Sequence, residues 1–102
     1  MTVYNKLVRD KIPELIEKQG EKPNIRILEK EEYLHHLEDK LNEEVGEYHR
    51  DKNAEELADI LEVVYALAET IGCTKDELLA CYEKKHAQRG GFRDRVFLEG
   101  KD

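Results

Sequence analysis

Two stretches with helical periodicity, separated by the polar turn "DKN", constrain the fold of this 102-residue chain more than any other feature. The first stretch, from about residue 30 to residue 50, has apolar residues at steps of three and four: Leu34, Leu37, Leu41, Val45 and Tyr48. The second, from about residue 54 to residue 71, is apolar over more than one stripe. We therefore expect an antiparallel αα-hairpin whose second helix is buried on several sides, with help from other subunits.

Shorter signals place the remaining elements. Pro13 suits the first turn of a helix that Gly20 can stop. Thr74 and Glu77 form a T-x-x-E capping box, which predicts a further helix that ends near Arg89, before "GG". The apolar runs at residues 25–28 and 96–98 are candidates to pair as a short terminal β-structure. The predicted fold class is all-α, a small helical bundle built on the hairpin, as a single domain over residues 1–102.

Composition narrows the partners. With 17 Lys and Arg against 24 Asp and Glu, the net charge is −7, which leaves no basic surplus for binding nucleic acid. No long apolar run or targeting segment is present, so we expect neither secretion nor membrane spanning. Cys73 and Cys81 have neither the number nor the spacing of a disulfide framework or a zinc site. We therefore expect a reduced, cytoplasmic setting.

The stretch "EEVGEYHRDKNAEELAD", residues 43–59, contains seven acidic residues. Glu44 and Glu47 stand three apart, as do Glu56 and Asp59, so each pair shares one face of its helix. When the chain folds back at "RDKN", positions 44 and 59 face each other in the same register as positions 47 and 56. The spacing therefore predicts that all four carboxylates converge on one small volume.

These acids take the place of hydrophobic residues at the inner edge of the hairpin, where they would repel one another unless a counter-charge is present. Oxygen ligands in this number suit a hard divalent cation, Mg²⁺ first and Mn²⁺ next. The alternative is a solvated acidic face neutralised by basic residues. Only Arg50 and Lys52 lie within the stretch, and neither is placed to pair with all four acids. Near the N-terminus, Lys6, Arg9 and Lys11 could add positive potential, although solvation is the simpler expectation for them.

The acidic pattern resembles a known family. "EEVGE" followed by "EELADILEVVYAL" resembles the E-E-x-x-E … E-x-x-D signature of the MazG-like all-α nucleoside triphosphate pyrophosphohydrolases. The opening "YNKLVRDKIPELIE" and the later "KKHAQRGGF" resemble a subgroup labelled phosphoribosyl-ATP pyrophosphohydrolase-like. The resemblance extends from Tyr4 to about Glu99. The segment between the two acidic motifs is shorter than in many MazG-like proteins, which leaves little room for a specificity loop.

The resemblance implies site residues and assembly. By this resemblance the Mg²⁺ ligands would be Glu44, Glu47, Glu56 and Asp59. Lys85 and Arg89 would lie against the substrate phosphates, although both also suit the cationic C-terminus of a helix. The family also implies a homo-oligomer, a dimer or a tetramer, in which helices from different subunits shape each site.

The resulting hypothesis is an enzyme, a Mg²⁺-dependent pyrophosphohydrolase that converts a nucleoside triphosphate to the monophosphate and pyrophosphate. Glu43 or Glu47 would orient or deprotonate the attacking water. Two alternatives stay open. One is hydrolysis of phosphoribosyl-ATP in histidine biosynthesis, and the other is a non-catalytic helical module that binds nucleotides or drives oligomerisation.

Overall fold

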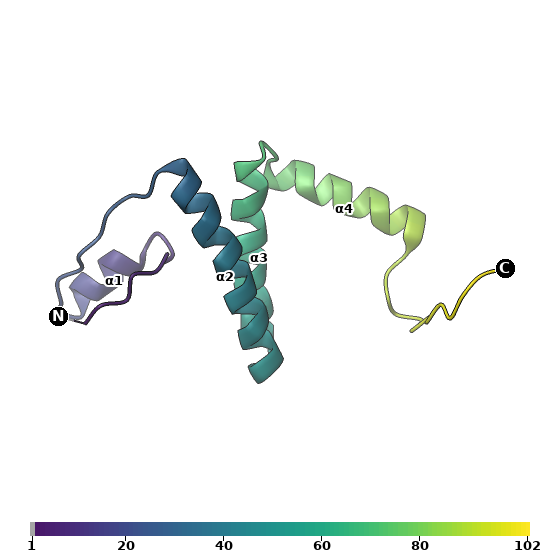
Figure 1. Ribbon diagram of the computed structural model, residues 1–102, viewed down its shortest axis with the longest axis horizontal. Coiled ribbons are helices and arrows are strands. Elements are labelled where there is room, and N and C mark those ends of the chain that lie inside the picture. The colour runs from purple at the N-terminus through teal and green to yellow at the C-terminus, as the bar shows by residue number, and fades with distance from the viewer. Residues whose placement is uncertain (1) are drawn as a thin grey trace.

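The computed structural model describes residues 2–102, and this part of the chain contains four helices and no β-strand. In chain order they are α1 (Ile12–Lys18), α2 (Lys30–Asp51), α3 (Ala54–Thr70) and α4 (Lys75–Arg89). Figure 1 shows α2 and α3 side by side and antiparallel. Helix α1 lies on one side of this hairpin, and α4 extends on the other side from the C-terminal end of α3. The all-α class and the αα-hairpin are confirmed.

A two-residue connection joins α2 to α3 and sets how the two helices align. Lys52 ends α2 in the left-handed conformation, with a φ of 47°, and its backbone N–H donates to the carbonyl of Tyr48 at 2.8 Å. Asn53 begins α3, because its side-chain oxygen accepts from the backbone N–H of Glu56 at 3.0 Å. The turn therefore fixes the alignment of the hairpin right beside its acidic residues.

The predicted start of α4 is confirmed. The Thr74 hydroxyl accepts from the backbone N–H of Glu77 at 3.1 Å, and the Glu77 carboxylate accepts from the backbone N–H of Thr74 at 3.2 Å. Before this capping box, Gly72 adopts a φ of +77°, a conformation that glycine reaches without steric cost. The chain thus leaves α3 through a tight turn and starts α4 in a new direction.

The hydrophobic core of one chain is small. Within residues 2–102 the buried hydrophobic residues are Leu37, Val63 and Ala68, all on α2 or α3. The accessible surface is 9615 Å². A compact folded chain of this mass would expose about 6,000 Å². The radius of gyration is 17.9 Å, whereas a compact domain of this length has about 13 Å. A single chain therefore forms a hairpin from which α1 and α4 project, and it does not close into a compact bundle by itself.

The predicted pairing of residues 25–28 with residues 96–98 is wrong. Both runs are coil, and Figure 1 shows them on opposite sides of the hairpin in a molecule 61 Å long. The side chains of Ile27 and Val96 are largely exposed. The reason is the direction of α4, which carries the C-terminal segment away from the N-terminal third of the chain. These runs therefore do not form β-structure, because no second strand of the same chain lies beside either of them.

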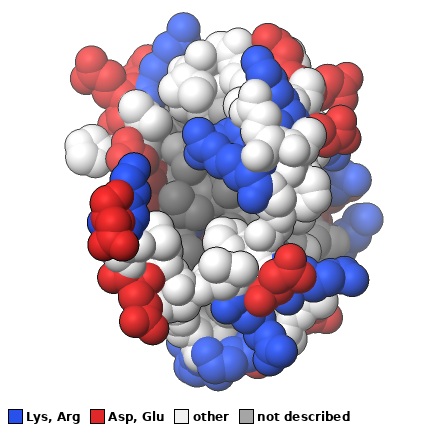
Figure 2. Space-filling model, turned by 90° about the vertical axis from the view of Figure 1, so that its right-hand side faces the viewer, with Lys and Arg blue, Asp and Glu red and all other residues white. Residues whose placement is uncertain are grey.

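On the face that Figure 2 shows, basic, acidic and uncharged side chains are interspersed, with several basic side chains adjoining one another in its lower part. Among the described residues, no helix combines the length and the apolar character needed to cross a bilayer.

Gly46 provides a test of the exposed side of α2. No atom lies within 4 Å of the position that a Cβ would occupy there. Because alanine favours a helix interior over glycine, we expect Gly46→Ala to raise the free energy of unfolding by about 1 kcal/mol in urea denaturation. Gly72→Ala is the control, and it should destabilise the protein because alanine is strained at the positive φ of that position. A loss of stability in Gly46→Ala would instead indicate that another chain packs against this position.

Candidate metal centre

The four carboxylates that the sequence predicts to converge lie together in the structure. One oxygen from each of Glu44, Glu47, Glu56 and Asp59 lies within 4.8 Å of the other three. Helix α2 supplies the first two residues and α3 the other two, on either side of the short turn. The predicted geometry is therefore confirmed, whereas the use of these residues as metal ligands stays a prediction.

Burial distinguishes this acidic cluster, defined by those four residues, from an ordinary acidic surface. Among residues 2–102, Glu44 is the one charged residue that is buried, with 7% of its surface exposed. Its Oε2 atom is buried without a hydrogen-bond partner, and so is Oε2 of Glu56. Buried acceptors left unpaired carry a desolvation penalty. A cation among the four carboxylates would satisfy both atoms, so the residues fit a hard divalent cation that takes oxygen ligands.

The carboxylates also perturb one another. The pKa of Glu44 is raised to about 7, by burial first and by the adjacent Glu47 carboxylate second, while the Lys40 ammonium opposes the shift. Burial, followed by the charge of Glu47, raises the pKa of Glu56 above its ordinary value. Both shifts mean that the folded chain holds negative charge at this place at a cost, which a bound cation would offset.

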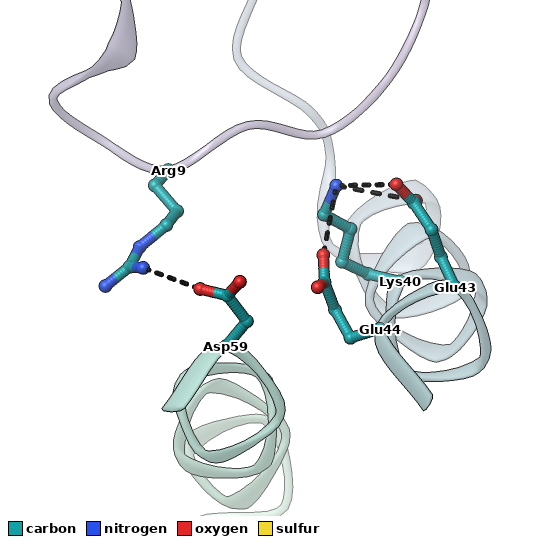
Figure 3. Close-up of polar contacts among 5 residues, drawn as sticks. All are labelled: Arg9, Lys40, Glu43, Glu44 and Asp59. Atoms are coloured by element: carbon teal, nitrogen blue, oxygen red, sulfur yellow. Dashed lines mark hydrogen bonds and ion pairs between the residues drawn. The ribbon is translucent and has the colours of Figure 1, made fainter. Parts of the chain in front are cut away.

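Lys40 is a counter-ion of the cluster that was not predicted. Its Nζ atom lies 3.4 Å from Oε1 of Glu43 and 3.7 Å from Oε1 of Glu44, and its side chain is only 17% exposed. Figure 3 shows Lys40 between the two carboxylates on α2. The spacing contained the signal, because Lys40 precedes these acids by three and four residues on one helix. Lys40 lies before the acidic stretch at residues 43–59, so it is not among the basic residues of that stretch.

Arg9 is the second unexpected counter-ion. Its Nη1 atom donates to Oδ1 of Asp59 at 3.2 Å, and its Nη2 atom lies 3.9 Å from Oε1 of Glu62. The residue belongs to the coil before α1, and Figure 3 shows its side chain directed at Asp59 on α3. No local pattern could reveal this contact, since the partners are 50 residues apart. Arg9 is solvated as expected, with a side chain 62% exposed, but it also pairs with Asp59, which the sequence did not indicate.

These two basic groups do not neutralise the cluster. Four carboxylates face one ammonium and one guanidinium, and each of these cations is shared with a further acid, Glu43 or Glu62. When all four carboxylates are ionised, a formal excess of two negative charges therefore stays in a half-buried volume. A surface neutralised by neighbouring lysines accounts for only part of this arrangement.

The other predicted site residues lie outside the cluster. Glu43 binds Lys40 at its rim, with the Glu43 side chain 41% exposed. Lys85 and Arg89 are exposed on α4, which contacts α3 and leads away from the hairpin (Figure 1). From the start of α4 to Lys85 the helix rises about 15 Å. One chain therefore does not bring these two residues to its own carboxylates, and their contact with phosphates stays a prediction.

Comparison with known proteins adds little to this site. No family model matches the chain. The chain is similar to an uncharacterised protein of Mycolicibacterium smegmatis, with 56% identity over 41 residues. The match covers 40% of this chain and 42% of the mycobacterial protein, so the chain spans less than half of that relative. No solved structure matches. The resemblance to MazG-like proteins therefore stays a prediction.

The raised pKa of Glu44 predicts a pH dependence of stability in the metal-free protein. The folded chain keeps this carboxyl protonated up to about pH 7, whereas the unfolded chain releases the proton near 4.5. The free energy of unfolding should therefore fall as the pH rises through this window. Glu44→Gln should remove the larger part of the fall and stabilise the protein at pH 8 by up to about 3 kcal/mol, whereas the raised pKa of Glu56 leaves a smaller fall.

Urea denaturation in EDTA at a series of pH values measures this effect. Glu55→Gln is the matched control, because Glu55 neighbours the cluster in sequence but is exposed at the start of α3. The control should keep the pH profile of the unmodified chain. If Glu44→Gln also kept that profile, the assignment of the titration to Glu44 would be wrong.

Proposed function

We propose that this chain is a Mg²⁺-dependent nucleotide pyrophosphohydrolase, which hydrolyses a nucleoside triphosphate to the monophosphate and pyrophosphate. The observation that supports it most is the acidic cluster, in which four carboxylates meet and two buried oxygens have no partner. Oxygen-only ligands in a partly buried, negatively charged volume suit Mg²⁺, with Mn²⁺ as a substitute. Cys73 and Cys81 are unpaired, which supports the cytoplasmic setting that belongs to this proposal.

In this proposal the four residues of the cluster hold the ion. When bound, Mg²⁺ supplies positive charge that offsets the charge on the phosphates and makes water a better nucleophile. In addition to the groups that would hold the ion, the chain would need an acidic group that orients or deprotonates the attacking water. Glu47 lies within the cluster and Glu43 lies beside it, paired with Lys40, so these two carboxylates are the candidates for this role.

A homo-oligomer, dimer or tetramer, is part of the proposal. The chain exposes roughly 3,600 Å² more surface than a compact protein of its mass, which is ample for an obligate interface. Among the apolar residues on or beside α3, a single chain leaves Leu57 and Leu61 about half exposed and Ile71 largely exposed. Helix α4 of a second chain would then be the element that brings Lys85 and Arg89 to the cluster.

The substrate panel follows from the chemistry. Phosphoribosyl-ATP is the second candidate, because the blocks "YNKLVRDKIPELIE" and "KKHAQRGGF" resemble the subgroup labelled for it. It presents the same triphosphate as a nucleoside triphosphate. A non-catalytic helical module that binds nucleotides would bind members of the same panel and release no product.

Pyrophosphate release tests the proposal directly. We expect release from at least one nucleotide of a panel that includes phosphoribosyl-ATP, in the presence of Mg²⁺ and not of EDTA. Asp59→Asn and Glu47→Gln should each lower the rate by at least about 100-fold, because each removes a charged ligand. Circular dichroism should show unchanged helical content in both variants. Glu55→Gln, which alters an exposed acid outside the cluster, should keep full activity.

Two outcomes would contradict this assignment. Absence of pyrophosphate release from every nucleotide would exclude the enzyme. Full activity in both Asp59→Asn and Glu47→Gln would exclude the acidic cluster as its site.

Subunit complementation tests whether α4 acts in another chain. Asp59→Asn and Lys85→Ala should each be inactive alone. When the two variants are unfolded together and refolded, a dimer that shares its sites should regain about a quarter of the unmodified activity, because half of the dimers contain one intact site of two. Light scattering on the same samples gives the subunit number. No recovery in a mixed oligomer would place Lys85 outside the partner's site.

A further inference from the structure

We propose that Arg9 binds the phosphates of the ligand at this site, and that Asp59 holds its guanidinium in place while no phosphate is bound. The inference rests on the proposed function for the cation in the acidic cluster. It adds to that site a residue from the coil before α1, which no spacing in the sequence connects with the carboxylates.

Position is the first reason. The Arg9 guanidinium reaches Asp59 at 3.2 Å and Glu62 at 3.9 Å, so it spans one cluster residue and the neighbouring acid on the same face of α3. Figure 3 shows it entering from the coil and pointing toward the carboxylate of Asp59. Among the basic residues of one chain, Lys40 and Arg9 contact acids of this site, whereas Lys85 and Arg89 are carried away by α4.

Exposure separates the two basic groups. The Lys40 side chain is 17% exposed and lies between Glu43 and Glu44, and its ammonium already pairs with both carboxylates. The Arg9 side chain is 62% exposed. A guanidinium has five N–H donors, and a single hydrogen bond to a side chain uses one of them here. Arg9 can therefore donate to a phosphate oxygen without first losing its contact with Asp59, and its planar fork suits phosphate geometry.

The backbone of Arg9 is anchored while its side chain is open to solvent. The Arg9 carbonyl accepts from the backbone N–H of Ile12 at 3.0 Å, which ties the residue to the first turn of α1. The anchored backbone keeps the guanidinium within reach of the cluster, and the long side chain can adjust to a ligand. A purely structural clamp is a weaker explanation, because exposed ion pairs contribute little to stability.

Charge is the remaining reason. Four carboxylates with one divalent cation still carry a negative excess, which would repel a polyphosphate that approaches the site. A guanidinium at the edge of the cluster lowers that repulsion on the side from which it extends. Arg9 would thus permit an acidic cation site and an anionic ligand to lie side by side.

Three variants of the full chain test this inference. Arg9→Ala removes the guanidinium, and Arg9→Lys keeps the charge without the fork. Arg26→Ala is the matched control, since Arg26 forms an equally exposed ion pair with Glu32, at 2.9 Å, outside the acidic cluster. For each variant, electron paramagnetic resonance measures Mn²⁺ binding, and calorimetry measures the affinity for inorganic tripolyphosphate with saturating Mg²⁺.

We expect Arg9→Ala to keep Mn²⁺ affinity within about threefold and to weaken tripolyphosphate binding about tenfold or more, because a hydrogen bond between charged groups is lost. Arg9→Lys should lie in between, and Arg26→Ala should equal the unmodified chain. With a hydrolysed nucleotide, Arg9→Ala should raise KM more than it lowers kcat.

The outcomes separate this inference from the proposed function. Equal tripolyphosphate affinity in Arg9→Ala and Arg26→Ala would overturn the role of Arg9, even if pyrophosphate is released. A structural clamp would give a different pattern. Arg9→Ala would lose both Mn²⁺ binding and helical content, Arg9→Lys would restore both, and the affinity for tripolyphosphate relative to that for Mn²⁺ would not change. That pattern would overturn the inference as well. Failure of the unmodified chain to bind tripolyphosphate would do the same. Tripolyphosphate binding that depends on Arg9, without hydrolysis of any nucleotide, would support the inference and contradict the enzyme.

Discussion

The two-residue connection between α2 and α3 is the constraint on which the rest of the structure depends. Lys52 ends one helix and Asn53 begins the next, so the two helices have no freedom to slide along each other. A shift of one residue on either helix would rotate its side chains by roughly 100° and separate the carboxylates. The same alignment also places Leu37 and Val63 in the buried apolar part of the hairpin. Apolar packing and the acidic cluster are therefore two parts of one interface.

The two parts act in opposite directions on stability. Burial of the Leu37, Val63 and Ala68 side chains stabilises the hairpin, whereas the half-buried carboxylates repel one another and leave buried oxygens unpaired. The core is also small for a chain that exposes 9615 Å². Binding of a cation among the carboxylates, or of a second chain on the exposed apolar surface, would each favour the folded state by mass action. In the proposed enzyme, the site and the subunit interface would thus both add to the stability of the hairpin.

The parts of the fold that the sequence predicted are those that local spacing determines. Glu44 and Glu47 share a helical face, and a short turn aligns them with Glu56 and Asp59, so the cluster follows from residues 43–59 alone. The capping box at Thr74 is equally local. What failed depends on contacts between distant segments. The runs at 25–28 and 96–98 are kept apart by the direction of α4, and Arg9 meets Asp59 only after the N-terminal coil has packed. Lys40 was within reach of local reasoning, but it lies outside the acidic stretch.

The arrangement of charge separates rigid groups from adjustable ones. All four carboxylates stand on the paired helices, where two backbones and a short turn hold them. The basic groups proposed to bind phosphates stand elsewhere: Arg9 is on a coil, and Lys85 and Arg89 are on a helix that buries none of its residues in one chain. A cation needs ligands at nearly constant distances, which suits the hairpin. Phosphates of different length and orientation need donors that can move, which suits long basic side chains on the periphery. In the proposed enzyme this division would fix the cation while substrates differ in the group that carries the phosphates.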